Sequence, residues 1–80
     1  MKVDKEDIYI IISNTLEIDL EIIKYINENN EFEIYGMTSV SAMQLLINLE
    51  EKYNFEFKDE DLLINKFNTL KKLFCLLENY

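Results

Sequence analysis

The sequence contains no arginine, histidine, proline or tryptophan, and it has one glycine and one cysteine. Without histidine, and with a single cysteine, the usual zinc, haem and catalytic-triad sites cannot be assembled. A disulfide framework is excluded as well, which fits a reducing, cytoplasmic location. No cationic segment precedes a long apolar run, and the apolar run at residues 8–12 is too short to span a bilayer. We therefore expect neither a catalytic site nor a metal site.

Charge of one sign dominates the chain. Sixteen acidic residues face eight lysines, which gives a formal net charge of −8, while 49% of the 80 residues are apolar. A negative surface argues against nucleic acid and anionic membranes as partners. The charge is uneven, because residues 1–37 hold nine acids and three lysines (net −6), whereas residues 38–53 have a net charge of −1. We expect one domain over residues 1–80, a soluble monomer that works by binding.

The periodicity of apolar residues predicts an all-α protein with three long helices and one short one. The first helix covers about residues 5–17, is capped by Asp4, and buries Ile8, Ile11, Ile12 and Leu16. In the connection over residues 18–37, Asp19 can cap a short turn with Ile22, Ile23 and Ile26 on one side. The alternation of Phe32 and Ile34 with polar residues then predicts extended chain, which ends at Gly36.

The second half of the chain carries the stronger helical signals. A long helix is predicted over residues 39–53, ended by Asn54, followed by a loop that carries Phe55 and Phe57. Asp59 can cap a short helix over residues 60–64 that buries Leu62 and Leu63. Asn68 or Thr69 caps the last helix, which ends near Glu78 and has an inward stripe of Leu70, Leu73, Phe74 and Leu77.

The helix over residues 39–53 has two apolar sides. At about 100° per residue, Ala42, Leu45, Leu46, Leu49 and Tyr53 form a core-facing stripe. Val40, Met43 and Ile47 fall on the opposite side, close to Gln44 and Glu51. A domain of this size can bury only one of the two sides, so the second predicts a binding surface. The alternative is that residues 18–37 fold over it.

Ser39 lies at the N-terminal end of that second side. Gly36 can turn the chain sharply into the helix. Thr38 is a competent N-cap, which leaves the hydroxyl of Ser39 in the first turn and directed outward. The unpaired N–H groups and the positive dipole end of a helix N-terminus favour a phosphate at this position. A plain Thr-Ser helix cap is the alternative that spacing alone leaves open.

Residues 35–53 read Tyr-Gly-Met-Thr-Ser-Val-Ser-Ala-Met-Gln-Leu-Leu-Ile-Asn-Leu-Glu-Glu-Lys-Tyr. This stretch resembles the acyl and peptidyl carrier protein family, whose pattern is glycine, an apolar residue, usually aspartate, the modified serine, and leucine or valine. In that family a helix follows that ends in Leu-Glu-Glu and an aromatic residue. The segments Phe-Glu-Phe-Lys-Asp-Glu-Asp-Leu (55–62) and Phe-Asn-Thr-Leu (67–70) look like the second half of the family pattern.

The resemblance implies an acyl-carrier-protein-like bundle of three long helices, with one short helix between the second and the last. It implies that Ser39 receives 4′-phosphopantetheine from coenzyme A through a phosphopantetheinyl transferase, with Gly36 and Thr38 shaping the site. The chain would be a stand-alone carrier of acyl or aminoacyl thioesters and not an enzyme. Its partners would be the transferase, an adenylating ligase or acyltransferase, and downstream biosynthetic enzymes. The expected docking residues are Val40, Met43, Gln44, Ile47, Glu50 and Glu51.

Thr38 stands where the family usually has aspartate, and the helix has Ser41, Gln44 and Asn48 where housekeeping carriers usually have carboxylates. These differences favour a specialised pathway of the nonribosomal peptide or polyketide type. A housekeeping fatty acid carrier and a D-alanine carrier for cell-wall polymers remain alternatives. Since Thr38 supplies no charge, an unmodified, degenerate carrier that binds a protein through the same apolar side is the alternative of another class.

Two other features carry no function of their own. Cys75 has no histidine or arginine near it in sequence to activate a thiolate, so we expect a small, half-buried packing residue. Asp59, Glu60 and Asp61 lack the alternating ligands and central glycine of a calcium-binding loop. They are better explained as a helix cap with favourable first-turn charges.

Overall fold

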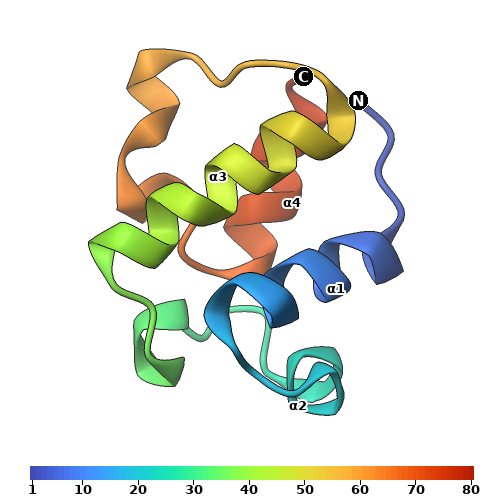
Figure 1. The fold of residues 1–80 in the computed structure, drawn as a ribbon, viewed down its shortest axis with the longest axis vertical. Coiled ribbons are helices and arrows are strands. Elements are labelled where there is room, and N and C mark those ends of the chain that lie inside the picture. Colours follow the sequence, from blue (N-terminus) through green and yellow to red (C-terminus); the bar gives the residue numbers. More distant parts are fainter.

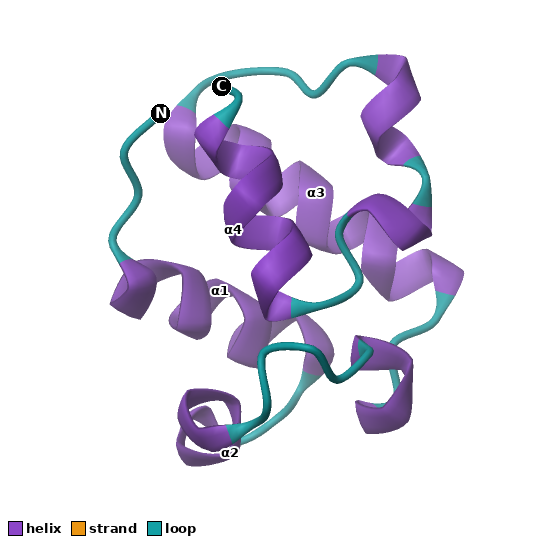
Figure 2. Cartoon of the chain, turned by 180° about the vertical axis from the view of Figure 1, so that it is seen from behind, coloured by secondary structure: helices purple, strands orange, loops and turns teal.

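The fold contains four α-helices and no strand, in a computed structural model that describes all residues from 1 to 80 (Figures 1 and 2). The helices are α1 (Lys5–Leu16), α2 (Leu20–Tyr25), α3 (Ser39–Tyr53) and α4 (Leu70–Glu78). Three short 3-10 turns join them: η1 (Phe32–Tyr35), η2 (Asp59–Leu62) and η3 (Ile64–Lys66). The predicted all-helical fold is confirmed, but its short α-helix is α2, which lies between the first two long helices, whereas the short helix predicted between α3 and α4 consists of 3-10 turns.

The core lies among the three longest helices. α1 packs against α3, and α2 packs against α1. α4 crosses α3 on the side that faces away from the reader in Figure 1 and toward the reader in Figure 2. Every α-helix contributes to the core. The side chains that are completely or almost completely buried are Phe32, Phe67, Ile8, Ile12, Ile23, Leu45, Leu46, Leu49, Leu73 and Leu77.

Local signals determine where the long helices begin and end. The Asp4 carboxylate accepts a hydrogen bond from the Glu6 N–H at 2.9 Å and caps α1 as predicted. The Thr69 hydroxyl accepts from the Lys72 N–H at 3.1 Å and caps α4. Asn54 ends α3 in the left-handed conformation with φ 55°. Asparagine tolerates this conformation better than most residues, which explains why α3 stops there.

The segment between α1 and α3 differs from the prediction at two points. Ile22 is 47% exposed, because a helix of six residues presents only one side to the core and Ile23 occupies it. Phe32 and Ile34 do not lie in extended chain. They lie in the 3-10 turn η1, whose threefold period points Phe32 into the core and leaves Ile34 69% exposed. Asp19 holds the N-cap position of α2 but makes no side-chain cap bond.

The segment between α3 and α4 is helical but irregular. The short helix predicted over residues 60–64 is replaced by η2 and η3, which meet at Leu63. Asp59 therefore lies inside the first turn of η2 and caps nothing, and Leu63 is 59% exposed while Leu62 is half-buried. The two turns still join α3 to α4 by a short helical connection at the expected place.

The last helix buries the predicted leucines and one more. Leu70, Leu73 and Leu77 are buried as predicted, Phe74 is half-buried, and Leu76 is buried as well. Cys75 is exposed, so its prediction as a half-buried residue was wrong. It lies about 200° around the helix from both Leu73 and Leu77, on the side away from the core.

The hydroxyls of Tyr53, at the end of α3, and of Tyr80, at the C-terminus, have opposite surroundings. The Tyr53 hydroxyl is buried and has no hydrogen-bond partner. Its burial, and to a lesser extent the negative charge of Asp7, raise the pKa of Tyr53 above its ordinary value of 10.0. The Tyr80 hydroxyl accepts from the Lys58 N–H at 2.9 Å and donates to the Asp61 carboxylate, and its ring packs on Phe55. Burial and the bond to Asp61 also raise the pKa of Tyr80.

We predict that the same chemical change has opposite effects at these two sites. Tyr53→Phe removes an unsatisfied buried hydroxyl and raises the free energy of unfolding by about 1 kcal/mol, whereas Tyr80→Phe loses two hydrogen bonds and lowers it by about 1 kcal/mol. Urea unfolding at pH 7, followed by circular dichroism, measures both. Because each folded pKa is raised, stability falls as the pH rises through 10.0 and beyond, and each variant shows a shallower fall. Equal shifts for the two variants at pH 7 would contradict these assignments.

Candidate functional site

The chain enters α3 through a tight reversal at Gly36. This residue ends η1 with φ 100°, a conformation that only glycine adopts without strain, and its N–H donates to the Glu33 carbonyl at 3.1 Å. A Cβ at this position would meet no atom within 4 Å, so the requirement for glycine comes from the backbone alone. Met37 follows, buried to 5% exposure, with its N–H bonded to the Phe32 carbonyl at 3.2 Å. The reversal therefore anchors the chain immediately before α3.

Thr38 and Ser41 form a reciprocal cap at the start of α3. The Thr38 hydroxyl accepts from the Ser41 N–H at 3.3 Å, and the Thr38 N–H donates to the Ser41 hydroxyl at 2.9 Å. This arrangement is a capping box, and it satisfies two backbone donors that the helix itself leaves free. The prediction that Thr38 caps the helix is confirmed. The cap therefore makes Ser39 the first residue of α3.

Ser39 is the first residue of α3, and its side chain is exposed. The chain has two other serines, and both use their hydroxyls internally. Ser13 donates to the Ile18 carbonyl at the end of α1, and Ser41 belongs to the capping box. The Ser39 hydroxyl has no such bond, and the N–H groups of Ser39 and Val40 lie in the first turn, where no intrahelical acceptor exists. Ser39 is thus the one serine with a free hydroxyl beside free backbone donors.

A network of polar contacts ties the segment before Ser39 to the start of α4. The Phe32 N–H donates to the Asn68 carbonyl at 2.8 Å, and the buried Asn68 amide donates to both Glu33 oxygens at 3.2–3.3 Å. The Lys72 ammonium donates to the Asn68 side-chain oxygen at 3.3 Å. The sequence suggested Asn68 only as a possible helix cap. Its role in holding η1 involves contacts across 35 residues, so no local pattern could reveal it.

The second apolar side of α3 is open. Val40 is 78% exposed, Met43 39% and Ile47 42%, while Ala42, Leu45, Leu46 and Leu49 on the opposite side are buried. The prediction of two apolar sides, one of them exposed, is confirmed, and the alternative in which residues 18–37 cover it is wrong. That this side docks partners stays a prediction. Its residues follow Ser39 along the same helix.

Polar residues border the exposed side of α3. Gln44 is exposed and donates to the Asn48 side-chain oxygen at 2.9 Å, and Asn48 in turn donates to the Thr15 hydroxyl of α1 at 2.8 Å. Glu51 is exposed, whereas Glu50 is half-buried and its carboxylate accepts from the Phe57 N–H at 2.8 Å. Glu50 therefore holds the loop after α3. At 1.5 Å per residue, Glu50 and Glu51 lie about 17 Å along the helix from Ser39.

A shallow hollow opens beside the C-terminal end of α3. It is bordered by Ile47, Glu50, Glu51, Asn54, Phe55 and Glu56. The sequence had placed Ile47, Glu50 and Glu51 on one surface, and the structure brings them together. Glu56 was not predicted there, because only the left-handed turn at Asn54 returns the chain over the end of the helix.

The comparison with protein families agrees with this geometry. The family described as phosphopantetheine attachment site matches residues 6–74, which cover the start of α3 and most of the core. The chain belongs to this family. Members are carriers to which 4′-phosphopantetheine is bound covalently, and carrier domains of this kind are in general not catalysts. In the other comparisons, no curated protein and no solved structure gave a significant match.

The start of α3, where Ser39 lies, suits a phosphate in charge. The 4′-phosphopantetheine group is anionic at its phosphate, and the first turn of α3 offers free N–H donors and the positive end of the helix dipole.

No three histidine, cysteine, aspartate or glutamate side chains lie close enough together to hold a metal ion. None of the helices has the length and hydrophobicity of a membrane span.

We predict that Thr38 stabilises the start of α3 through its hydroxyl and not through the branching of its side chain. Thr38→Ala loses the cap and lowers the free energy of unfolding by about 1 kcal/mol. Thr38→Ser keeps an acceptor for the Ser41 N–H and is the matched control, so it stays close to the wild type. Urea unfolding followed by far-ultraviolet circular dichroism measures both. If alanine and serine variants unfold at the same urea concentration, the cap contributes nothing.

Proposed function

We propose that Ser39 is the attachment point of 4′-phosphopantetheine in this carrier. The observation that supports this proposal best is the contrast among the three serines, since only the Ser39 hydroxyl is both exposed and free of internal hydrogen bonds. Gly36 and Thr38 contribute by position, because the reversal and the cap present Ser39 at the very first turn. When bound, the group supplies a thiol at the end of a long flexible arm, and that thiol carries a cargo as a thioester.

The chain's own part in its modification is small and well defined. The Ser39 oxygen forms the new bond to phosphorus while its proton passes to a base of the transferase, and the nucleotide half of coenzyme A leaves. The free N–H groups of the first turn of α3 would stabilise the negative charge of a phosphate attached to Ser39. The capping box keeps this turn formed, so that the donors are in place before the transferase arrives.

The partners in this proposal are a phosphopantetheinyl transferase, an adenylating ligase or acyltransferase that loads the thiol, and downstream biosynthetic enzymes. They dock on the exposed side of α3, where Val40, Met43 and Ile47 supply apolar contact and Gln44 lies beside them. Glu51 offers a free carboxylate at the far end, and Glu50 offers the oxygen that does not bind the Phe57 N–H. A contact with apolar residues at its centre and charged residues at its rim is the usual anatomy of a protein interface.

The composition of α3 favours a specialised pathway, of the nonribosomal peptide or polyketide type, over housekeeping fatty acid synthesis. Ser41, Gln44 and Asn48 occupy positions where carboxylates are usual in housekeeping carriers, and all three are engaged in hydrogen bonds within the chain. The net charge of residues 38–53 is only −1, from two acids and one lysine. Recognition of this helix therefore depends more on its apolar side than on charge.

One observation favours a second candidate function. Thr38 caps the helix but brings no carboxylate next to Ser39, where a charge would help a transferase that uses a metal ion to hold coenzyme A. An unmodified carrier-like module that binds a protein through the same exposed side is the alternative. The modification assay below separates the two.

We expect the chain to gain the mass of one 4′-phosphopantetheine when it is incubated with coenzyme A, magnesium and a phosphopantetheinyl transferase of broad specificity. Intact-protein mass spectrometry measures the gain. Ser39→Ala abolishes it, whereas Ser13→Ala, which removes a serine hydroxyl outside the capping box, retains it. No gain with several transferases, or a gain that persists in Ser39→Ala, would contradict the proposal.

We expect a charge on the exposed side of α3 to impair docking without unfolding the chain. Val40→Asp and Ile47→Asp lower kcat/KM for Ser39 modification, and for subsequent loading, by about tenfold or more, because losing an interface anchor costs about 2 kcal/mol. Ile10→Asp is the matched control, since Ile10 is 42% exposed like Ile47 but lies on α1. Rates equal to that of the control in both α3 variants would remove this surface from the proposal.

A further inference from the structure

Three side chains, Glu33, Asn68 and Lys72, form a polar bridge between η1 and the start of α4. The Asn68 amide donates to the two Glu33 carboxylate oxygens at 3.2–3.3 Å, and the Lys72 ammonium donates to the Asn68 side-chain oxygen at 3.3 Å. Both ends of the bridge are charged, and hydrogen bonds to charged groups are stronger than those between neutral groups. Asn68 is 5% exposed, whereas Glu33 and Lys72 are exposed. A buried amide therefore joins an acid of η1 to a base of α4.

The two charged neighbours of Asn68 determine how its amide is oriented. A carboxylate only accepts hydrogen bonds and an ammonium only donates them. The amide nitrogen must therefore face Glu33, and the amide oxygen must face Lys72. Asn68→Asp would keep an acceptor for the Lys72 ammonium but would set a second carboxylate against Glu33. The contact with Glu33 can thus be removed while the contact with Lys72 is kept.

Two backbone hydrogen bonds join the same segments beside the bridge. The Phe32 N–H donates to the Asn68 carbonyl at 2.8 Å, and the Lys71 N–H donates to the Glu28 carbonyl at 3.0 Å. Neither bond uses a side chain of residue 33 or 68. A substitution at either position therefore leaves both backbone bonds available and tests the side-chain bridge alone.

The Glu33 end of the bridge leads to Ser39. The Glu33 carbonyl accepts from the Gly36 N–H at 3.1 Å, so Glu33 is held through its backbone and its side chain at once. Gly36 makes the reversal, the Met37 N–H donates to the Phe32 carbonyl at 3.2 Å, and α3 begins at Ser39. A displacement of Glu33 would therefore reach Ser39 through the reversal.

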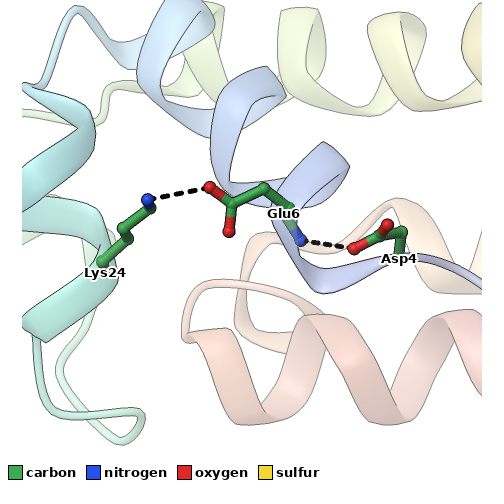
Figure 3. A network of polar contacts seen from close by, with 3 residues as sticks. All are labelled: Asp4, Glu6 and Lys24. Carbon is green, nitrogen blue, oxygen red and sulfur yellow. Dashed lines mark hydrogen bonds and ion pairs between the residues drawn. The ribbon is translucent and has the colours of Figure 1, made fainter.

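A different charged contact fixes the far end of the connection between α1 and α3. Lys24 of α2 forms an ion pair with Glu6 of α1 at 2.8 Å, and the Glu6 N–H donates to the Asp4 carboxylate, as Figure 3 shows. Both side chains of the ion pair are partly exposed, and such pairs contribute little to stability. The ion pair holds α2 and not η1, so its removal is a control for the removal of the bridge.

We infer that Asn68 is a positioning residue for the modification of Ser39. It acts through Glu33, which it holds together with Lys72, and it thereby fixes the reversal at Gly36 from which α3 begins. The inference rests on the proposed function, because it concerns the serine that the transferase modifies. A displacement of about 1 Å can slow an enzymatic reaction by about a hundredfold. The bridge therefore affects the transfer step and not the docking of the transferase on α3.

The first test measures kcat and KM for Ser39 modification by mass spectrometry, with the full chain, coenzyme A, magnesium and a transferase of broad specificity. Glu33→Ala removes the acceptor on an exposed residue, and we expect kcat to fall about fivefold while KM stays close to that of the wild type. Glu33→Gln keeps an acceptor for the Asn68 amide and is the matched variant, so both its constants stay close to those of the wild type. Glu6→Gln, the control at α2, also behaves like the wild type.

The second test exchanges the donor and the acceptor of the bridge. Asn68→Asp places two carboxylates against each other, so kcat falls at least as far as in Glu33→Ala. The double variant Asn68→Asp/Glu33→Gln sets an amide donor against a carboxylate again and restores most of kcat. The buried carboxylate is present in both variants, so a general loss of stability at position 68 would not be reversed in the double variant.

Hydrogen exchange separates this inference from the proposed function, because it needs no transferase. The Met37 N–H reports on the reversal, and we expect it to exchange about fivefold faster in Glu33→Ala than in Glu33→Gln. A wild-type chain that gains no mass would contradict the proposed function, and the exchange rates would then decide whether the bridge fixes the reversal.

Four results would overturn the inference. They are equal exchange of the Met37 N–H in the two Glu33 variants, equal kcat in these variants, a rise of KM alone, and no recovery of kcat in the double variant. A raised KM in Glu33→Gln would identify Glu33 as a direct contact of the transferase instead.

Discussion

The reciprocal cap between Thr38 and Ser41 is the interaction on which the rest of the site depends. It fixes the first residue of α3, and it does so directly after a buried anchor, Met37, and a backbone reversal that only glycine makes without strain. One residue later the side chain is exposed and the backbone donors are free. The cap thus leaves the Ser39 hydroxyl exposed in the first turn of α3.

The helix that begins at Ser39, α3, has one side in the core and the other exposed to solvent. Its inner side completes the core with α1 and α4, and its outer side leaves Val40, Met43 and Ile47 in solvent. The acidity of the chain is largely elsewhere, since residues 1–37 carry nine acids against three lysines. Apolar contact and charge are therefore separated along the chain. α3 offers the apolar contact, and residues 1–37 carry most of the negative charge.

The parts of the fold that depend on local chemistry could be predicted from the sequence. The bounds of α3, its cap at Thr38 and its end at Asn54 follow from the identity of a few neighbouring residues. The parts that depend on distant contacts could not be predicted. η1 resembles a strand in its alternation of Phe32 and Ile34, and a bond to Asn68, far along the chain, holds it as a 3-10 turn. Glu50 was expected only as a docking residue, and its hydrogen bond from the Phe57 N–H depends on the turn of the chain at Asn54.

The central claim is that Ser39 carries the 4′-phosphopantetheine, and the most direct measurement locates the group on the protein as it is made in its own cell. Cleavage after lysine yields a peptide of residues 25–52, which contains both Ser39 and Ser41. Fragmentation of that peptide by tandem mass spectrometry assigns the added mass to one of the two residues. The geometry of the cap predicts the mass on Ser39 alone. An unmodified peptide, or a group on Ser41, would contradict the claim.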